Sequence, residues 1–332
     1  FSGKTFDKGK FCAYLKEKEE ARQYAVKDNA LNIGIIGARA NESIKKILAE
    51  NGANVAFDLT CTGLGRKILV DEKDVLTGYA RGLLSQFPCM RMEQAAGRDE
   101  LIRRSAGSVD GIIYHTVQFC DNYAYEYAWL KEWLDRPLLL LETDYTRQSG
   151  GQVRTRIEAF LESLTAERKK PERKRKEDGT MYVMGIDSGS TSTNAVIMDQ
   201  DRKIKAFSVV RTGAKSGVSA DKVLHEVLEK AGLKREDISW IVSTGYGRVS
   251  IEFADENVTE ISCHGKGAHY FNPNIRTILD IGGQDSKAIR LSESGEVKDF
   301  VMNDKCAAGT GRFLEMIART LEVSLDELGA IA

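Results

Sequence analysis

Two short stretches of the sequence carry residues that suit the binding of phosphate. Residues 187–191 read Asp-Ser-Gly-Ser-Thr, and residues 280–285 read Asp-Ile-Gly-Gly-Gln-Asp. A turn of small residues lets backbone N–H groups approach a phosphate closely, and hydroxyl groups add further donors. The leading aspartates repel phosphate, but they can hold Mg²⁺, usually through water, and the metal then bridges to phosphate oxygens.

These two stretches are copies of one pattern. Residues 186–197 align without a gap with residues 279–290, so that Asp187 matches Asp280. Each copy reads as a β-hairpin, in which an apolar strand with the aspartate leads through a polar turn into a second strand. For either copy alone, an ordinary hairpin turn is the alternative, since Gly, Ser and Asp are turn residues in any case. The repetition favours two lobes that face a common cleft.

The cysteines of the sequence stand apart from one another, with no close Cys-x-x-Cys pair: Cys12, Cys61, Cys89, Cys120, Cys263 and Cys306. A disulfide framework belongs to small secreted domains, and this chain is neither small nor visibly secreted. We therefore expect reduced thiols, some of them buried and inert and a minority acting as metal or cluster ligands. Among the histidines, His115 is the best candidate ligand because it ends an expected strand shortly before Cys120. A hydrogen-bonded structural role is the alternative.

The composition fits a globular protein and excludes several classes of partner. With 332 residues and a hydrophobic share of 42%, the chain can bury sizeable cores. Its net charge of −1 gives no general attraction to nucleic acid or to an anionic membrane surface. No apolar run of about 18 residues predicts a transmembrane helix, and no signal peptide is visible. We expect a cytoplasmic protein that binds neither nucleic acid nor membrane.

A charged stretch divides the sequence into two segments. Residues 165–180 are almost wholly charged and contain a Pro and a Gly, so they are expected to form a solvated linker. A tail for nucleic acid is the alternative, which the interleaved acidic residues disfavour. We expect domains at 1–164 and 181–332. The chain starts without Met and stops just after a helical pattern, so the first domain looks truncated at its N-terminus and the second at its C-terminus.

Alternating strands and helices predict an α/β fold for residues 1–164. Continuous apolar strands imply a parallel sheet covered on both faces, of the flavodoxin-like kind. Ligands gather at the carboxyl ends of such strands, but no full dinucleotide-binding fingerprint is present. The expected strands are 31–38, 54–59, 111–115 and 137–141, and the expected helices are 42–50, 122–134 and 152–164. Between the two aspartate turns, the sequence predicts helices at 219–231 and 258–270 and a strand at 238–243.

The second segment resembles a known group of ATPases. Its two aspartate turns look like the first and second phosphate motifs of the acetate kinase, sugar kinase, Hsp70 and actin superfamily, which has a ribonuclease H-like fold. Within that superfamily, residues 181–332 resemble the activator component of 2-hydroxyacyl-CoA dehydratases. The motifs that carry this resemblance are Ser243-Thr-Gly-Tyr-Gly-Arg248, Ser262-Cys-His-Gly265, Asp280-Ile-Gly-Gly-Gln-Asp285 and, above all, Asn303-Asp-Lys-Cys-Ala-Ala-Gly-Thr-Gly-Arg-Phe313.

This resemblance implies an ATP-driven iron–sulfur protein. It implies a homodimer with one [4Fe–4S] cluster at the interface, to which each subunit gives two cysteines. It puts Cys306 at one ligand position and the other ligand in a later motif, after residue 332. The two cysteines of this segment are too few for four thiolate ligands within one chain, which agrees with a shared cluster. Cys263 matches no ligand position and is expected to be structural. A partner that donates the electron, such as ferredoxin or flavodoxin, is implied as well.

The first segment carries a resemblance of its own. The strings at residues 111–121, 141–145 and 151–160 resemble the C-terminal domain of a dehydratase subunit or of the related double-cubane cluster proteins. That resemblance places an iron–sulfur ligand at Cys120, in the string Phe-Cys-Asp. Cys61 and Cys89 are further candidate ligands.

Together these features predict ATP-dependent one-electron transfer that reductively activates a 2-hydroxyacyl-CoA dehydratase-like protein, which the first segment itself could be. Asp187 and Asp280 are expected to hold Mg²⁺, and Gln284 or Asp285 to position the attacking water. The residues expected to hold the phosphates of ATP are Ser188, Gly189, Ser190, Thr191, Gly282, Gly283 and Gln284. A small-molecule kinase of the same superfamily is one alternative, and a redox-silent, nucleotide-dependent switch is another.

Overall fold

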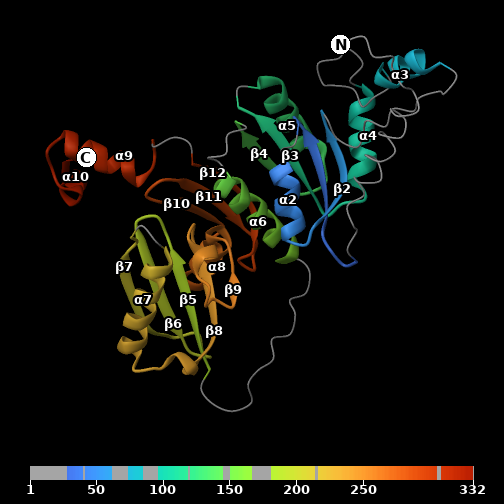
Figure 1. The fold of residues 1–332 in the computed structure, drawn as a ribbon. Coiled ribbons are helices and arrows are strands. Elements are labelled where there is room, and N and C mark those ends of the chain that lie inside the picture. The colour runs from blue at the N-terminus through green and yellow to red at the C-terminus, as the bar shows by residue number, and fades with distance from the viewer. Residues whose placement is uncertain are drawn as a thin grey trace, which may run out of the picture. The chain divides into compact units, whose positions relative to one another are not determined.

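The computed structural model describes residues 28–39, 42–61, 74–84, 96–118, 120–144, 150–166, 181–213, 216–304 and 308–331. The chain divides into two compact units, unit 1 at Phe1–Leu164 and unit 2 at Thr165–Ala332, and each is described by itself (Figure 1). Most of the expected linker, residues 167–180, lies outside the described residues. Within the described ranges, every helix is too short or too polar to span a lipid bilayer.

Unit 1 is an α/β structure built on a parallel sheet. Its strands lie in the order β2-β1-β3-β4, and each neighbouring pair is parallel. This is the order of the first four strands in doubly wound sheets of the flavodoxin type. The elements are β1 (Asn32–Gly37), α2 (Glu42–Glu50), β2 (Asn54–Thr60), α3 (Val75–Leu84), α4 (Ala96–Ala106), β3 (Gly111–Val117), α5 (Asp121–Trp133), β4 (Leu138–Thr143) and α6 (Gly150–Ala166).

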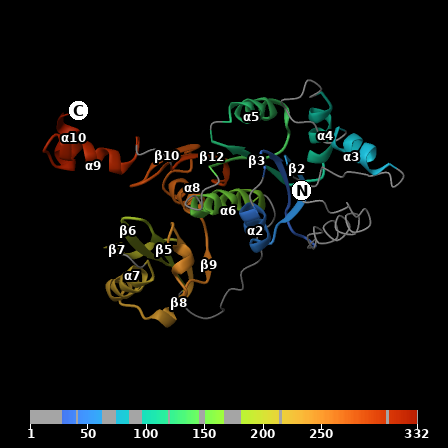
Figure 2. The ribbon, with the colours of Figure 1, turned by 45° about the horizontal axis from the view of Figure 1, so that its top comes forward.

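Helices cover both faces of this sheet, as its buried apolar strands require. On one face, Ile36 and Tyr114 pack in a cluster with residues of α4 and α5. On the other face, Phe160 and Leu164 of α6 lie so close to Gly111 that a side chain there would meet them below 3 Å. Figure 2 shows α4 and α5 on one side of the strands and α2 and α6 on the other.

Unit 2 contains a five-stranded sheet of order β7-β6-β5-β8-β9 and a three-stranded antiparallel sheet of order β10-β11-β12. In the larger sheet, β8 runs parallel to β5, whereas β6 is antiparallel to β5 and β7 is antiparallel to β6. The sheet is therefore mixed. The elements are β5 (Tyr182–Ser188), β6 (Ser192–Met198), β7 (Ile204–Arg211), α7 (Ser216–Ala231), η1 (Arg235–Asp237), β8 (Ile238–Thr244), η2 (Arg248–Ser250), β9 (Glu256–Asn257), α8 (Glu260–Phe271), β10 (Thr277–Ile281), β11 (Ser286–Leu291), β12 (Val297–Asn303), α9 (Gly311–Thr320) and α10 (Leu325–Ile331).

The duplicated pattern folds as two β-hairpins, which confirms that part of the sequence interpretation. In the hairpin of β5 and β6, Asp187 lies opposite Asn194. In the hairpin of β10 and β11, Asp280 lies opposite Lys287, at the same place in the pattern. A third antiparallel strand extends each hairpin, β7 beside β6 and β12 beside β11. The two sheets of unit 2 are therefore built on the same three-strand plan.

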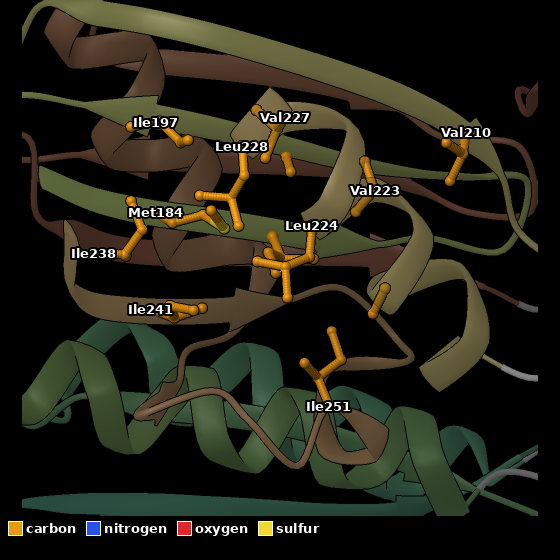
Figure 3. Packing of buried hydrophobic residues seen from close by; sticks show 13 residues of the cluster. Met184, Ile197, Val210, Val223, Leu224, Val227, Leu228, Ile238, Ile241 and Ile251 are labelled. Carbon is orange, nitrogen blue, oxygen red and sulfur yellow. The ribbon is translucent and has the colours of Figure 1, made fainter. Parts of the chain in front are cut away.

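Helix α7 covers one face of the five-stranded sheet and forms the main core of unit 2 with it. Its apolar residues recur at helical spacing and are buried: Ala220, Val223, Leu224, Val227 and Leu228. They pack onto Met184 of β5, Ile197 of β6 and Ile241 of β8, as Figure 3 shows. Because β5 is the central strand, this core fixes the strand end that carries Asp187.

The expected α/β class is present, and most elements of unit 1 begin and end within a few residues of their expected bounds. Helices α3 and α4 have no counterpart among the expected elements. In α4, Leu101 and Ile102 are the only large apolar residues, which is too weak a pattern to indicate a helix. In α3, Gly78 interrupts the sequence and Leu76 is 79% exposed, so no buried face is visible from the residue types.

His115 lies at the carboxyl edge of the sheet of unit 1 and is fully buried. Its Nε2 is 2.8 Å from Thr143 Oγ1 at the end of β4, and its Nδ1 is 3.3 Å from the carbonyl oxygen of Ala38 after β1. The ring therefore ties the ends of β1 and β4 to β3. Burial lowers the pKa of His115 below its usual value of 6.5. These contacts favour the structural role over that of a ligand.

This burial predicts a loss of stability in acid. As the pH falls through about 6.5, the unfolded chain binds a proton at His115 more readily than the folded chain does, so the free energy of unfolding of unit 1 decreases. His115→Gln should remove this part of the pH dependence, measured between about pH 5 and pH 7.5 by hydrogen exchange of the β3 amides. His225→Gln, on the exposed side of α7, should leave it in place. An unaltered pH slope in the His115 variant would contradict the assignment.

Candidate phosphate-binding site

Thr212, just after β7, braces the first aspartate turn. The N–H of Gly189 donates to the carbonyl oxygen of Ser192 (3.0 Å), and the N–H of Thr212 donates to that of Thr191 (3.0 Å). The hydroxyl of Thr212 also donates to the carbonyl oxygen of Gly189 at 2.9 Å. These bonds use the turn's carbonyl oxygens, while the side chains of Ser190 and Thr191 remain exposed.

The loop at residues 244–248, which follows β8, presses against this turn. The N–H of Gly247 donates to the carbonyl oxygen of Ser188 at 2.9 Å. At Gly245 the backbone has a φ of +82°, and an added Cβ would lie 2.5 Å from Asp187 Oδ1. At Gly247 it would lie 2.3 Å from Ser188 Oγ. Gly245 therefore has two reasons to be glycine, its left-handed backbone and its lack of space.

The second aspartate turn nearly touches the first. A Cβ built at Gly283 would lie 3.1 Å from Thr191 Oγ1 and 3.9 Å from Ser190 Oγ. The distance to Thr191 Oγ1 is shorter than ordinary van der Waals contact. The two turns therefore lie on either side of one narrow gap. Small residues on both sides keep the backbone of each turn within reach of anything placed between them.

The start of α9 supports the second turn from behind. The N–H groups of Gly311 and Arg312 donate to the carbonyl oxygens of Gly282 and Gly283, at 2.9 and 3.1 Å. Within the turn, the N–H of Gly282 donates to the carbonyl oxygen of Asp285 at 2.9 Å. The second turn is thus connected directly to the helix that follows the string at residues 303–310.

The two leading aspartates stand in opposite electrostatic surroundings. Burial raises the pKa of Asp187 above its usual range, although the charge of His264 and a hydrogen bond from Asn194 act against this. Asp280 Oδ2 lies 3.0 Å from His264 Nδ1 and 3.4 Å from Lys287 Nζ. The hydrogen bond from His264 lowers the pKa of Asp280 and, in return, raises that of His264. The pKa values of the two equivalent aspartates are therefore shifted in opposite directions.

The last residue of the second turn is held by two partners. Asp285 is buried, and its Oδ2 accepts a hydrogen bond from the hydroxyl of Tyr246 (2.9 Å) and lies 2.7 Å from Lys287 Nζ. Tyr246 belongs to the loop after β8, so Asp285 joins the two sheets of unit 2. Gln284, by contrast, is exposed. Of the two residues expected to position water, Gln284 alone has a side chain open to solvent.

The donors and charges around the gap fit a phosphate chain with a divalent cation. Ser188 Oγ and Thr244 Oγ1 are buried and have no hydrogen-bond partner among the described residues, a deficit that a ligand can satisfy. Asp280 lies near enough to Asp187 for its charge to raise the pKa of Asp187. A pair of neighbouring carboxylates suits Mg²⁺, which is usually bound through one or two carboxylates together with phosphates.

The cysteine assignments fall largely outside the described residues. Cys306, Cys12 and Cys89 lie there, so their surroundings are not part of the fold described above. Cys120 and Cys61 are half-buried thiols that pack against the same apolar cluster of unit 1. Cys61 Sγ is 2.6 Å from the hydroxyl of Tyr123. In the described part of the chain, no three His, Cys, Asp or Glu side chains are grouped to hold a metal ion.

Four residues that the sequence interpretation does not assign belong to this site: Tyr246, Arg248, Glu260 and Lys287. Tyr246 and Arg248 lie inside a motif that the sequence already marks. Lys287 is detectable because it takes the place of Asn194 in the duplicated pattern. The role of Glu260 could not be predicted from the sequence, because its two cationic partners come from two different sheets.

Gly245 offers a test of the close approach between the loop and the first turn. Gly245→Ala should displace Asp187 and weaken Mg-ATP binding by about 10- to 100-fold, because a shift of about 1 Å is enough for such a loss. Isothermal titration calorimetry measures this. Gly232→Ala is the matched control: it has a φ of +65° but nothing within 4 Å of an added Cβ. Both variants carry backbone strain of about 1–2 kcal/mol. Equal binding in the two variants would show that the clash is irrelevant.

Comparison with family models gives different matches for the two units. Residues 5–164 match the model of the 2-hydroxyglutaryl-CoA dehydratase D-component. Residues 184–332 match the model of the BadF/BadG/BcrA/BcrD ATPase family. Each model covers less than half of the chain.

Individual relatives match about half of the chain. The activator of lactoyl-CoA dehydratase from Anaerotignum propionicum is 53% identical over 151 residues, 46% of this chain and 58% of the relative. The (R)-2-hydroxyglutaryl-CoA dehydratase activating ATPase of Acidaminococcus fermentans is 45% identical over 153 residues, 46% of this chain and 58% of the relative. A solved structure of the Clostridium difficile 2-hydroxyisocaproyl-CoA dehydratase activator with bound ADPNP shares 46% identity, with a TM-score of 0.43, and covers 46% of this chain and 56% of that one. The chain spans less than three fifths of each.

These matches correct the family assignment made from the motifs. That assignment took residues 181–332 as a 2-hydroxyacyl-CoA dehydratase activator, preceded by the C-terminal part of a dehydratase subunit or a double-cubane cluster protein, and it is wrong as stated. It rested on motifs between residues 243 and 313, above all the string at residues 303–313. The matched models instead describe residues 5–164 as similar to a dehydratase D-component and residues 184–332 as similar to the BadF/BadG/BcrA/BcrD ATPases.

Proposed function

We propose that the protein hydrolyses ATP to drive one-electron transfer that reductively activates a 2-hydroxyacyl-CoA dehydratase-like protein. The observation that carries the ATP-dependent part is the near contact of two glycine turns, with Asp187 and Asp280 at the same gap. The electron-transfer part is supported by 45–53% identity to dehydratase activators over about half the chain.

The proposal gives each residue of the gap a chemical role. Asp187 and Asp280 would hold Mg²⁺, which would supply positive charge to neutralise the phosphates. Gln284, being exposed, would orient the attacking water. Asp285, held by Tyr246 and Lys287, would keep the second turn in place. The groups that would bind phosphate are the N–H and hydroxyl groups of Ser188, Gly189, Ser190 and Thr191 and the N–H groups of Gly282, Gly283 and Gln284.

The redox part assigns Cys306 to a [4Fe–4S] cluster shared by two copies of the chain, and Cys120 to an iron–sulfur site of the first segment. In the sequence, Cys306 comes five residues before Gly311, whose N–H group donates to the second turn. A movement of that turn would therefore reach Gly311 and Arg312, which follow Cys306 closely in the sequence. A low-potential donor such as ferredoxin or flavodoxin would supply the electron.

The two segments of the chain would form two domains joined by a linker. Residues 1–164 would form a flavodoxin-like domain, residues 165–180 a linker, and residues 181–332 an ATPase domain of the actin and Hsp70 type. The first segment, similar to a dehydratase D-component, would itself be a target of the electron. Because donor and acceptor would belong to one chain, their effective concentration for one another would be about millimolar. Because the thiols must stay reduced, the proposed location is the cytoplasm.

Replacing either aspartate tests the ATP site. Asp187→Asn and Asp280→Asn should each lower the apparent affinity for Mg²⁺ and the rate of ATP hydrolysis by about 10- to 100-fold, as is typical when a group that holds a metal through water is removed. Asp221→Asn, exposed on α7, is the control. A rate equal to the parent's in both variants would remove the site assignment. ATP consumption that requires a small-molecule hydroxyl acceptor would favour a kinase instead.

Cys306 tests the redox assignment. Purified without oxygen, the full-length protein should be a dimer with about four irons of the shared cluster per two chains, beyond any iron held by Cys120. Cys306→Ser should lose that iron and the reductive activity while still binding Mg-ATP, because the aspartate turns are separate. Cys263→Ser, a half-buried thiol on α8, should keep the iron. Full iron content and full activity in the Cys306 variant would leave a redox-silent switch or a kinase as the better account.

A further inference from the structure

Glu260 is the first residue of α8, the helix that leads from the five-stranded to the three-stranded sheet of unit 2. Its side chain is 5% exposed. Both carboxylate oxygens are buried and have no hydrogen-bond partner among the described residues. A buried carboxylate without hydrogen bonds is unfavourable unless nearby cations compensate for its lost hydration.

One compensating cation belongs to the five-stranded sheet. Arg248 Nη1 lies 3.6 Å from Glu260 Oε2, and the guanidinium is almost fully buried. The same Nη1 donates to the carbonyl oxygen of Gly245 at 3.0 Å. Gly245 lies against Asp187 with no room for a side chain between them. Arg248 therefore connects Glu260 with the loop that supports the first aspartate turn.

The other cation belongs to the three-stranded sheet. Lys287 Nζ lies 4.0 Å from Glu260 Oε1 and is likewise almost fully buried. It also lies 2.7 Å from Asp285 Oδ2 and 3.4 Å from Asp280 Oδ2. Lys287 therefore connects Glu260 with both acidic residues of the second turn.

We propose that Glu260 is a positioning residue that couples the two aspartate turns through Arg248 and Lys287. The inference rests on the proposed function for the identity of the ligand, but not for the coupling itself. Because Glu260 is balanced by one cation from each sheet, displacing either turn leaves a buried charge less compensated. Each turn therefore holds the other in place, and the alignment of Asp187 with Asp280 depends on this carboxylate.

The coupling is tested first without nucleotide, by hydrogen exchange of the two turns. Glu260→Gln keeps the shape and removes the charge. Exchange should become at least about tenfold faster at both Gly247 and Gly282, whose N–H groups donate to Ser188 and Asp285, while the α7 amides stay protected. Glu293→Gln, an exposed change between β11 and β12, should alter neither turn. Faster exchange in only one turn, or in none, overturns the proposal.

If Glu260→Gln proves too unstable, the two cations give the same answer separately. Arg248→Gln should speed exchange at Gly282 in the other sheet, and Lys287→Gln should speed exchange at Gly247. A purely local role predicts effects within the sheet that carries the substitution. If each substitution speeds exchange only in its own sheet, the proposed coupling is wrong.

Kinetics distinguish positioning from mere stabilisation. In Glu260→Gln, kcat for ATP hydrolysis should fall about 10- to 100-fold, because misalignment of about 1 Å has that effect. KM should change less than about threefold, since each turn keeps its own donors. If Glu260 served stability alone, Glu260→Gln would lower the melting temperature and leave kcat at the parent value at all temperatures below the transition. That result would count against the proposal. If the parent protein hydrolyses no ATP, the proposed function fails, while the exchange data still decide the coupling.

Discussion

The organisation of unit 2 depends on one steric constraint, the absence of space for side chains where its glycine loops meet. At Gly245 and Gly247 the loop after β8 lies against the end of β5, and at Gly283 the second turn lies against the first. Because these contacts are between backbone and small side chains, they bring Asp187 and Asp280 to one gap. The cations of the site lie behind this gap, where burial strengthens their interaction with the carboxylates.

Those buried charges are the second organising feature of the site. Arg248, Glu260, Lys287 and Asp285 are each less than one tenth exposed. Removing one partner of a buried ion pair typically costs about 3–5 kcal/mol, whereas a well-packed apolar replacement of the whole group is often neutral. A buried cluster of charges therefore adds little stability compared with a well-packed apolar cluster. Its position between two sheets agrees better with a role in fixing their turns.

Much of this arrangement could be predicted from local sequence patterns. The two hairpins follow from a repeated strand–turn–strand pattern, and the aspartates at their ends follow from the alignment of Asp187 with Asp280. The partners of the aspartates could not be predicted in the same way, because Glu260 and Tyr246 come from elements separated from the second turn in sequence. Helix α4 was missed because its buried face rests on few apolar residues. The family assignment rested on short motifs between residues 243 and 313, and the models matched over residues 5–164 and 184–332 correct it.

The duplicated hairpins also differ in one position that matters for the gap between them. Opposite Asp187 stands the neutral Asn194, and opposite Asp280 stands the cationic Lys287, with His264 on the same side. Two turns alike in backbone and unlike in charge set up an electric field across the space they enclose. A molecule whose charge is concentrated at one end has a preferred direction in such a field. Asp285 and Lys287, at the places that Ser192 and Asn194 hold in the first copy, thus make the two sides of the gap unlike in charge.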